Sequence, residues 1–264
     1  MLVERTLFGI ENKVEKAIAR IKEFVPKEGY YVSFSGGKDS QVVLELVKQA
    51  GVKYDAHFNL TSVDPKEVIQ FVRKFYPEVI LHKPKKNMWT LIKENGMPPT
   101  RWQRYCCAWL KEGRGNDQDK GRKIITGVRW AESFKRSKRK IVEICMKDKS
   151  KTFINPIIEW SDKEIWEFIK INNLSYCCLY DQGFKRIGCI GCPMGSSKQK
   201  DMQFKRWPAY KNAYIKSFEK MIIERERKGL EKIRVYSTAE ECFNWWISDK
   251  KQDLEIPDQS IMFE

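Results

Sequence analysis

Two groups of residues have the types and the spacing for chemistry. The first lies in the stretch SFSGGKDS, where Ser35–Ser40 follows a short apolar segment and precedes the apolar run Val42–Leu44. A glycine-rich turn between a strand and a helix lets backbone N–H groups point at phosphate oxygens, and the helix N-terminus adds partial positive charge. The turn has neither the Walker spacing nor the GxGxxG spacing. It therefore predicts a site for a mononucleotide or pyrophosphate of another class.

The second group consists of cysteines. Cys106 and Cys107 are adjacent, and Cys189 and Cys192 form a CxxC motif. Disulfides are rare in a reducing compartment, whereas four thiolates can hold zinc or an iron–sulfur cluster. Because the side chains of adjacent residues diverge, the first pair is a poor zinc knuckle. The pattern predicts a metal centre and leaves its identity open.

Alternating strand and helix patterns must position these residues. Short apolar segments predict strands at 30–35, 54–59, 79–82, 123–127 and 152–154. Helical spacing predicts helices at 12–24, 41–49, 65–75, 88–93 and 161–172. The last of these has Ser161 as its N-cap and Glu164 three residues later, a capping-box signature. Strands that alternate with helices predict an α/β fold with a parallel sheet and right-handed crossovers.

The last part of the chain changes character. Residues 199–228 form a long basic stretch with helical spacing, and 237–248 predict a short amphipathic helix. We therefore expect residues 1–175 to form a nucleotide-binding α/β core that carries the Cys106–Cys107 insert. Residues 176–264 are expected to form the CxxC loop and a helical C-terminal appendage packed on that core.

The overall charge suggests a class of partner. The chain has 50 Lys and Arg against 35 Asp and Glu, a formal net charge of +15. Such a surface attracts polyanions, so nucleic acid is a candidate partner, and general solubility is the alternative explanation. No apolar run approaches the roughly 20 residues that span a bilayer. The stretch MLVERTLFGIENK lacks the features of a secretory signal, so we expect a cytoplasmic protein without a membrane partner.

The stretch SGGKDS resembles the PP-loop of the adenine-nucleotide alpha-hydrolase-like superfamily, also called N-type ATP pyrophosphatases. Its members have a Rossmann-like parallel sheet and cleave ATP between the α and β phosphates. One branch, the phosphoadenosine phosphosulfate (PAPS) reductases, holds a sulfonucleotide instead. The resemblance implies that Asp39 orients the loop or a Mg²⁺ ion and that Lys38 reaches a phosphate oxygen. It also implies phosphate contacts from four further loop residues, Ser35, Gly36, Gly37 and Ser40.

Three further stretches resemble the PAPS reductase branch: TSVDP at 61–65, TGVRWAESFKR at 126–136 and NPIIEWSDKEIWEFI at 155–169. In the first, the resemblance places Thr61 and Asp64 at the nucleotide, with Asp64 as a second candidate ligand of Mg²⁺. In the second, Arg129 and Arg136 would pair with phosphate or sulfate oxygens through forked hydrogen bonds. The third is a core and positioning element. The expected catalytic residues are Lys38, Asp39, Arg129 and Arg136.

The cysteine pattern CC…CxxC resembles the 4Fe-4S site of adenylylsulfate (APS) reductases and of the ATP pyrophosphatase used in bacterial DNA phosphorothioation. The resemblance implies a 4Fe-4S cluster, with zinc or a degenerate site as alternatives. Its expected ligands are Cys106, Cys107, Cys189 and Cys192.

One departure from the reductases directs the functional prediction. Assimilatory sulfonucleotide reductases carry a nucleophile in a C-terminal Glu-Cys-Gly-x-His element, but here Phe243 follows Cys242 and no histidine is near. We therefore expect an ATP pyrophosphatase that adenylates a substrate during sulfur transfer to nucleic acid. Its expected partners are a cysteine desulfurase or a thiol or electron donor, and a homodimer is a candidate assembly. The alternatives are a PAPS or APS reductase using Cys242, Cys177 or Cys178, and a non-enzymatic regulator that binds a nucleotide and a cluster.

Overall fold

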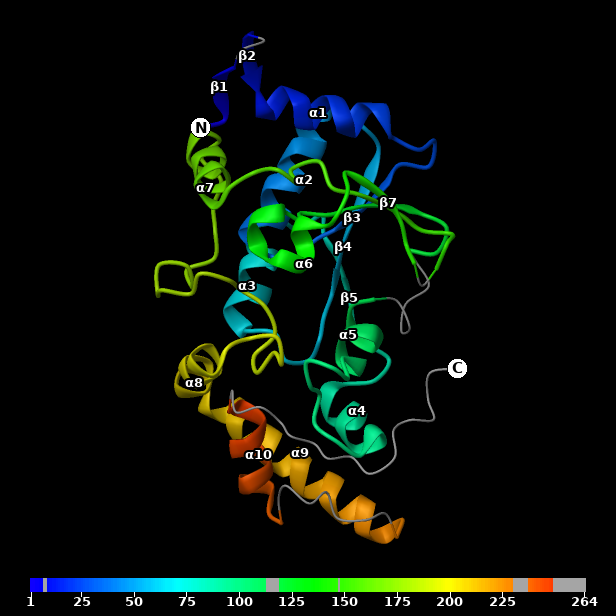
Figure 1. Ribbon diagram of the computed structural model, residues 1–264, viewed down its shortest axis with the longest axis vertical. Helices are drawn as coiled ribbons and strands as arrows, with labels where there is room; N and C mark the ends of the chain where they lie inside the picture. The colour runs from blue at the N-terminus through cyan, green and yellow to red at the C-terminus, as the bar shows by residue number, and fades with distance from the viewer. Residues whose placement is uncertain (7–8, 113–118, 147, 230–236, 249–264) are drawn as a thin grey trace. The chain divides into compact units, whose positions relative to one another are not determined.

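The computed structural model describes residues 1–6, 9–112, 119–146, 148–229 and 237–248 (Figure 1). The chain divides into two compact units, each assembled from two segments. The first unit comprises Met1–Met88 and Tyr105–Ile190, and the second comprises Trp89–Arg104 and Gly191–Glu264. The functional division predicted at 175/176 stays a prediction. None of the helices in the described ranges has the length and hydrophobicity that crossing a bilayer requires.

A six-stranded sheet forms the centre of the first unit. Its strands are β3 (Tyr30–Ser33), β4 (Tyr54–Asn59), β5 (Ile80–His82), β6 (Lys123–Ile125), β7 (Val142–Ile144) and β8 (Thr152–Ile154). They lie in the order β5-β4-β3-β6-β8-β7, and every neighbouring pair is parallel except the antiparallel edge pair β7–β8. All five predicted strands lie in this sheet, so the predicted α/β fold with a parallel sheet is confirmed.

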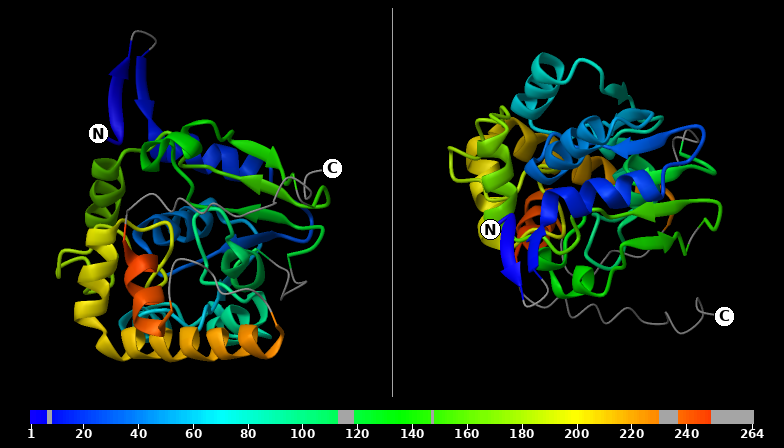
Figure 2. Two further views of the ribbon diagram at one scale, coloured as in Figure 1. Left: turned by 60° about the horizontal axis from the view of Figure 1, so that its bottom comes forward. Right: turned by 90° about the horizontal axis from the view of Figure 1, so that it is seen from above.

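Helices flank this sheet. They are α1 (Lys13–Glu23), α2 (Lys38–Ala50), α3 (Lys66–Phe75), α5 (Tyr105–Leu110), α6 (Phe134–Ser137) and α7 (Asp162–Ile171), with the 3-10 turn η1 at Trp130–Glu132. Helix α2 contacts both α1 and α7, and Figure 2 shows α1 lying beside α2. Helix α2 begins at Lys38, three residues before the predicted start, because Gly37 has an extended conformation and serves as the N-cap.

The N-terminal segment forms a two-stranded element that periodicity did not predict. Strands β1 (Val3–Thr6) and β2 (Gly9–Asn12) pair antiparallel, separately from the main sheet. Asn12 then serves as the N-cap of α1, its side chain accepting hydrogen bonds from the amides of Val14 and Glu15. Strands of four residues carry too little alternation for a period of two to stand out.

The second unit is helical. It contains most of α4 (Met88–Asn95), together with α8 (Ser197–Arg206), α9 (Pro208–Arg227) and α10 (Ala239–Ile247). The helical character predicted over 199–228 is confirmed, and the structure divides this stretch into two helices, because α8 ends at Arg206 and α9 begins at Pro208. Proline disfavours the helical conformation in the residue before it, and Trp207 accordingly has φ −125° and ψ 71°. The predicted helix at 237–248 is confirmed as α10.

Aromatic side chains form the core of the second unit. Tyr214 and Phe218 of α9 contact Trp246 of α10 with ring centroids 4.7 Å and 5.4 Å apart. Phe204 of α8 packs on Phe243 of α10 at 5.0 Å. All five rings are at least nine-tenths buried. Burial of this size is the main source of stability for a small helical unit.

The predicted capping box of α7 is confirmed and extended by an ion pair. The Ser161 side chain accepts a hydrogen bond from the Glu164 amide, and the Ser161 amide and hydroxyl donate to Glu164 Oε2. Lys13 Nζ lies 2.6 Å from Glu164 Oε1. Burial alone would raise the pKa of Glu164, but the hydrogen bonds from Lys13 and Ser161 outweigh it and lower this pKa to about 2.

Because the pKa of Glu164 is lowered in the folded protein, we expect the protein to lose stability in acid. This pKa falls from 4.5 to about 2 on folding, so the contribution of the carboxylate is present above pH 4.5 and is lost as the pH falls toward 2. The shift corresponds to about 3 kcal/mol at neutral pH. Urea denaturation of the wild type and of Glu164→Gln should therefore differ at pH 7 and converge near pH 2. Glu240→Gln, on the exposed surface of α10, should retain the wild-type profile; equal pH profiles for all three proteins would contradict the prediction.

Candidate functional site

The strand order places the predicted nucleotide loop at a switch point of the sheet. The chain continues from β3 through β4 to β5 on one side, and β6 and β8 lie on the other side of β3. In open α/β sheets, ligands bind outside the carboxyl ends of the strands at such a point. The segments that follow β3 and β6, which contain Ser35–Ser40 and Arg129, therefore meet at the expected binding edge.

The loop from Ser35 to Ser40 is held closed by its own serine. Ser40 Oγ donates to the Gly37 carbonyl at 2.8 Å and accepts from the Ser35 amide at 3.2 Å. Gly36 has φ +69°, and a Cβ placed there would lie 2.8 Å from Val68 Cγ1 of α3. Only glycine fits both the left-handed conformation and the close approach of α3. The loop therefore has the compact shape of a phosphate cradle at the N-terminus of α2.

Four charged side chains meet beside this loop. Arg129 is 1% exposed and lies in the centre, with Nε 2.6 Å from Asp39 Oδ1 and Nη2 2.6 Å from Asp162 Oδ1. Its Nη1 donates to the Trp160 carbonyl at 3.0 Å. Lys38 Nζ lies 3.2 Å from Asp39 Oδ2 and 3.2 Å from Asp162 Oδ1. The four groups form one network of two cations and two carboxylates, which we call the charge network.

The charge network favours the ionised forms of Arg129 and Asp162. Burial would lower the pKa of Arg129, but the attraction of Asp39 and the hydrogen bonds to Asp162 and Asp39 outweigh it and raise this pKa. Burial would raise the pKa of Asp162, but its hydrogen bond from Arg129 and the attraction of Lys38 lower it. Arg129 therefore fixes the position of the Asp39 carboxylate at the start of α2.

A glycine permits this arrangement. A Cβ on Gly127 would lie 2.9 Å from the backbone carbonyl atoms of Asp39. The segment after β6 can thus approach α2 closely enough for Arg129 to reach Asp39. Asp162 was not among the predicted site residues; its only sequence signal was its place in the stretch 155–169, which was assigned to positioning.

A tyrosine that sequence reasoning missed also contacts the loop. Tyr180 Oη accepts a hydrogen bond from the Lys38 amide at 2.8 Å, and Gln41 Nε2 donates to the Ser175 carbonyl at 3.0 Å. Burial raises the pKa of Tyr180, so its hydroxyl remains protonated at neutral pH. These two hydrogen bonds hold the segment 175–180 against the start of α2.

The same segment carries two cysteines in different environments. Cys177 is fully buried, and this burial raises the pKa of its thiol to about 11. Cys178 is exposed. Because a thiolate is the reactive form of cysteine, the raised pKa disfavours reaction at Cys177 at neutral pH, whereas Cys178 is accessible from solvent.

The turn after β4 joins a predicted nucleotide residue to a predicted cluster ligand. The Thr61 amide and hydroxyl donate to the two carboxylate oxygens of Asp64 at 2.6 Å and 2.8 Å. Cys189 Sγ lies 3.4 Å from Thr61 Oγ1, and the Ile190 amide donates to the Val63 carbonyl at 2.8 Å. The first cysteine of the CxxC motif is thus held against the Thr61–Asp64 turn.

The remaining predicted residues lie in separate places. Arg136 of α6 forms an ion pair with Glu132 one turn earlier. In α5, Cys106 is buried and Cys107 is half-buried, and Cys192 belongs to the second unit. Among the residues that the structure describes, no three Cys, His, Asp or Glu side chains are gathered as metal ligands. The cluster ligand set and the roles of the site residues therefore stay predictions.

Residues 29–194 match the family model of the phosphoadenosine phosphosulfate reductase domain. The chain belongs to this family. The match spans the PP-loop, the charge network and all four predicted cluster cysteines. The predicted family and its α/β fold are confirmed, whereas the match does not distinguish the phosphorothioation branch from the reductases.

Named relatives of this PAPS reductase-family chain include enzymes. It is 30% identical over 187 residues to an adenosine 5'-phosphosulfate reductase of Oceanobacillus iheyensis, covering 67% of this chain and 76% of that protein. It is 32% identical over 192 residues to an uncharacterized protein of Methanocaldococcus jannaschii, covering 70% of this chain and 46% of that protein. A second protein of that organism matches over 47% of its length. The chain thus spans about half the length of these two archaeal relatives.

A solved structure supports the fold of this family member. The phosphoadenylyl-sulfate reductase from Candida auris, in a phosphate complex, is 20% identical with a TM-score of 0.50. The similarity covers 67% of this chain and 87% of that one. At this identity the similarity shows the fold alone.

Proposed function

We propose that this PAPS reductase-family chain is an ATP pyrophosphatase that adenylates a substrate during sulfur transfer to nucleic acid. The observation that carries the proposal is the burial of Cys242. This residue is the nearest match to the C-terminal nucleophile of the assimilatory reductases, yet it is 0% exposed within α10. A nucleophile that attacks sulfate sulfur must be a mobile thiolate, so Cys242 cannot serve while α10 is folded.

The charge network suits the proposed adenylation. The acceptor oxygen forms a bond to the α-phosphorus as the bond to the bridging β-phosphate oxygen breaks and pyrophosphate leaves. Lys38 and Arg129 would stabilise the charge that develops around the α-phosphorus, and Arg136 would assist at the same nucleotide. Asp39, fixed by Arg129, is the proposed ligand of Mg²⁺, with Asp64 as a second candidate. Mg²⁺ would neutralise charge on the departing pyrophosphate.

The sulfur chemistry is assigned to the cysteines. We propose that Cys106, Cys107, Cys189 and Cys192 hold a 4Fe-4S cluster, since a donor set made only of thiolates suits iron–sulfur clusters. The contact between Cys189 and Thr61 supports a cluster near the nucleotide. The net charge of +15 supports nucleic acid as the acceptor. A cysteine desulfurase would supply the sulfur.

Pyrophosphate release tests the proposal. Anaerobically prepared protein with ATP and Mg²⁺ should release pyrophosphate, and Lys38→Ala should lower the rate about 10²–10³-fold by removing a charge at the reacting phosphate. Lys48→Ala is the matched control, because Lys48 lies on the same helix in a surface pair with Glu78 and should keep the full rate. Release of sulfite from APS or PAPS with a thiol donor, and no pyrophosphate from ATP, would refute the proposal. Iron and sulfide counts on the same preparation test the cluster.

Two observations favour a reductase as the second candidate. Cys178 is exposed in the segment that contacts the Lys38 amide through Tyr180, and the chain is 30% identical to a named APS reductase. In that case Cys178→Ser would abolish sulfite release and Cys242→Ser would not. If both variants retain wild-type rates of pyrophosphate release, the first candidate stands.

A further inference from the structure

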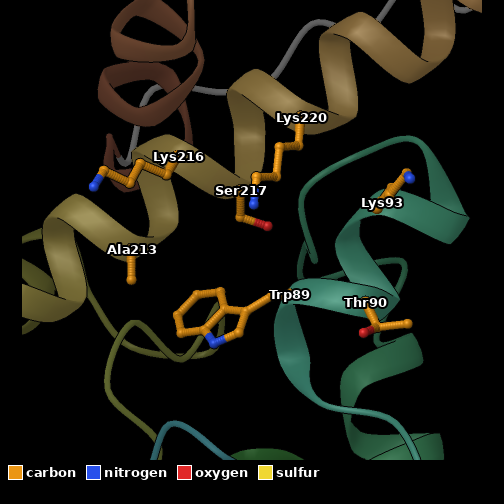
Figure 3. A pocket seen from close by; sticks show the side chains of 7 residues that line it. All are labelled: Trp89, Thr90, Lys93, Ala213, Lys216, Ser217 and Lys220. Carbon is orange, nitrogen blue, oxygen red and sulfur yellow. The ribbon is translucent and has the colours of Figure 1, made fainter.

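The second unit contains a cavity of about 420 Å³ between α4 and α9 (Figure 3). It is lined by Trp89, Thr90 and Lys93 of α4 and by Ala213, Lys216, Ser217 and Lys220 of α9. The α9 residues recur at intervals of three or four, so they share one face of the helix. Pockets of roughly 300–1,000 Å³ typically hold small ligands, so this cavity has room for one nucleotide.

The charged residues of this pocket are all cationic. Lys216 and Lys220 are exposed and have no ion-pair partner among the described residues. Lys93 Nζ lies 3.7 Å from Glu224, which is outside the lining. Three ammonium groups around one opening with no carboxylate in its lining favour an anionic ligand.

An aromatic ring forms one wall of the pocket. Figure 3 shows the Trp89 indole extending from α4 toward α9. Its ring packs edge-on against Tyr214 with centroids 5.0 Å apart, and Tyr214 is fully buried in the aromatic core. Trp89 is therefore held in place while remaining half-buried, as a stacking platform requires.

A buried hydroxyl gives an independent indication of a ligand. Ser217 is 5% exposed, and its Oγ has no hydrogen-bond partner among the described residues. Buried polar atoms without partners are rare and call for an explanation. Figure 3 shows this oxygen directed from α9 toward α4, so a polar atom of a ligand in the cavity can bond to it.

We propose that this pocket binds one nucleotide of a single-stranded nucleic acid. The base stacks on Trp89 and forms a hydrogen bond with Ser217, and flanking phosphates lie at Lys93, Lys216 and Lys220. Stacking and phosphate contacts together are the usual mode of single-strand binding. The inference deepens the proposed function, because it assigns recognition of the nucleic-acid acceptor to α4 and α9. It rests on the proposed function for the identity of that acceptor.

Fluorescence anisotropy with labelled single-stranded DNA and RNA oligonucleotides tests the pocket. The Lys216→Ala/Lys220→Ala variant should bind about tenfold more weakly at low salt, because two phosphate contacts are lost. The slope of log K against log salt concentration should fall by about 1.4, since each phosphate contact of a single strand contributes about 0.7. The matched control Lys198→Ala/Lys205→Ala removes two exposed lysines of α8 that do not line the pocket, and it should bind as the wild type does.

Trp89 variants separate stacking from charge. Trp89→Leu should weaken binding about tenfold without changing the salt slope, and Trp89→Phe should restore most of the affinity. Because Trp89 also packs on Tyr214, circular dichroism and a melting curve must show that both variants are folded. Equal affinity for the pocket and control lysine variants overturns the inference. Competition by a free mononucleotide as effective as competition by an oligonucleotide also overturns it, in favour of a small-molecule site.

These experiments distinguish failure of the pocket proposal from failure of the proposed pyrophosphatase function. Pocket-dependent oligonucleotide binding without pyrophosphate release from ATP would leave the pocket standing and refute the pyrophosphatase. Pyrophosphate release with identical oligonucleotide affinities for the pocket and control variants would support the pyrophosphatase and refute the pocket.

Discussion

Replacing Arg129 by alanine or methionine is expected to lower the free energy of unfolding by about 3–5 kcal/mol. Arg129 is 1% exposed, and its guanidinium forms ion pairs with Asp39 and Asp162. Removal of the guanidinium takes away the hydrogen bond that Arg129 donates to the buried carbonyl of Trp160. It also leaves Lys38 as the remaining cation of the network beside the two carboxylates of Asp39 and Asp162. Methionine fills most of the vacated volume, so a loss shared by both variants reports the missing charge rather than a cavity. Urea denaturation monitored by circular dichroism measures the change.

Arg136→Ala is the matched control for this experiment. Arg136 lies in the same segment after β6, but its ion pair with Glu132 is at the surface, with the Arg136 side chain 32% exposed. Surface pairs of this kind contribute about 0–1 kcal/mol, so Arg136→Ala should remain within that range. If Arg129→Met destabilises the protein no more than Arg136→Ala does, the charge network is not a structural unit.

Gly36→Ala is expected to weaken nucleotide binding about 100-fold. The new Cβ would lie 2.8 Å from Val68 Cγ1 at a residue with φ +69°, so the loop must move away from α3. A displacement of about 1 Å in groups that position a substrate is enough for a loss of this size. The strained conformation should also cost about 2–3 kcal/mol of stability. Calorimetric titration with ATP and with APS measures binding, and urea denaturation measures stability.

Gly51→Ala separates a loss of binding caused by the changed shape of the loop from one caused by reduced overall stability. Gly51 ends α2 with φ +66°, and a Cβ there would meet nothing within 4 Å. This variant shares the unfavourable backbone conformation, at a cost of about 1 kcal/mol, but displaces no neighbour. We expect it to bind nucleotide as the wild type does. Equal losses of affinity in both glycine variants would show that overall stability, not the shape of the loop, controls binding.

Local sequence patterns predicted most of the first unit. The strands at 30–35, 54–59 and 123–127 were found because short apolar runs between turns leave a clear local signal. The capping box at Ser161 was found for the same reason, since its two partners are three residues apart. The break before Pro208 carried a local signal too, but the basic helical spacing on both sides masked it.

Long-range pairing explains what local patterns did not predict. Arg129 contacts Asp39 and Asp162, which lie 90 and 33 residues away in the chain. The sequence indicated that Arg129 binds an anion, but it could not indicate that the anions include two carboxylates of the same chain. Tyr180 was missed because a single tyrosine in a loop has no pattern from which its contact with Lys38 could be inferred.

The pocket of the second unit shows the same limitation. Trp89 and Ser217 belong to helices that are far apart in the chain, and neither helix alone indicates a pocket. The sequence showed that the α9 region is rich in basic residues, but it did not indicate which lysines lie beside one another. Only the packing of α4 against the aromatic core brings the indole, the hydroxyl and the lysines around one cavity.

The discontinuous construction of the second unit has a consequence for synthesis on the ribosome. Residues Trp89–Arg104 are translated long before their partners: the Gly96 carbonyl accepts from Arg225 at 3.0 Å, and the Pro99 carbonyl accepts from Trp246 at 2.7 Å. Until α10 has left the exit tunnel, the apolar side chains of this segment, among them the fully buried Leu91, have no complete core to enter. The nascent chain is therefore expected to expose an apolar segment in the middle of the α/β unit until synthesis is nearly finished, and such transiently exposed surface is prone to aggregation.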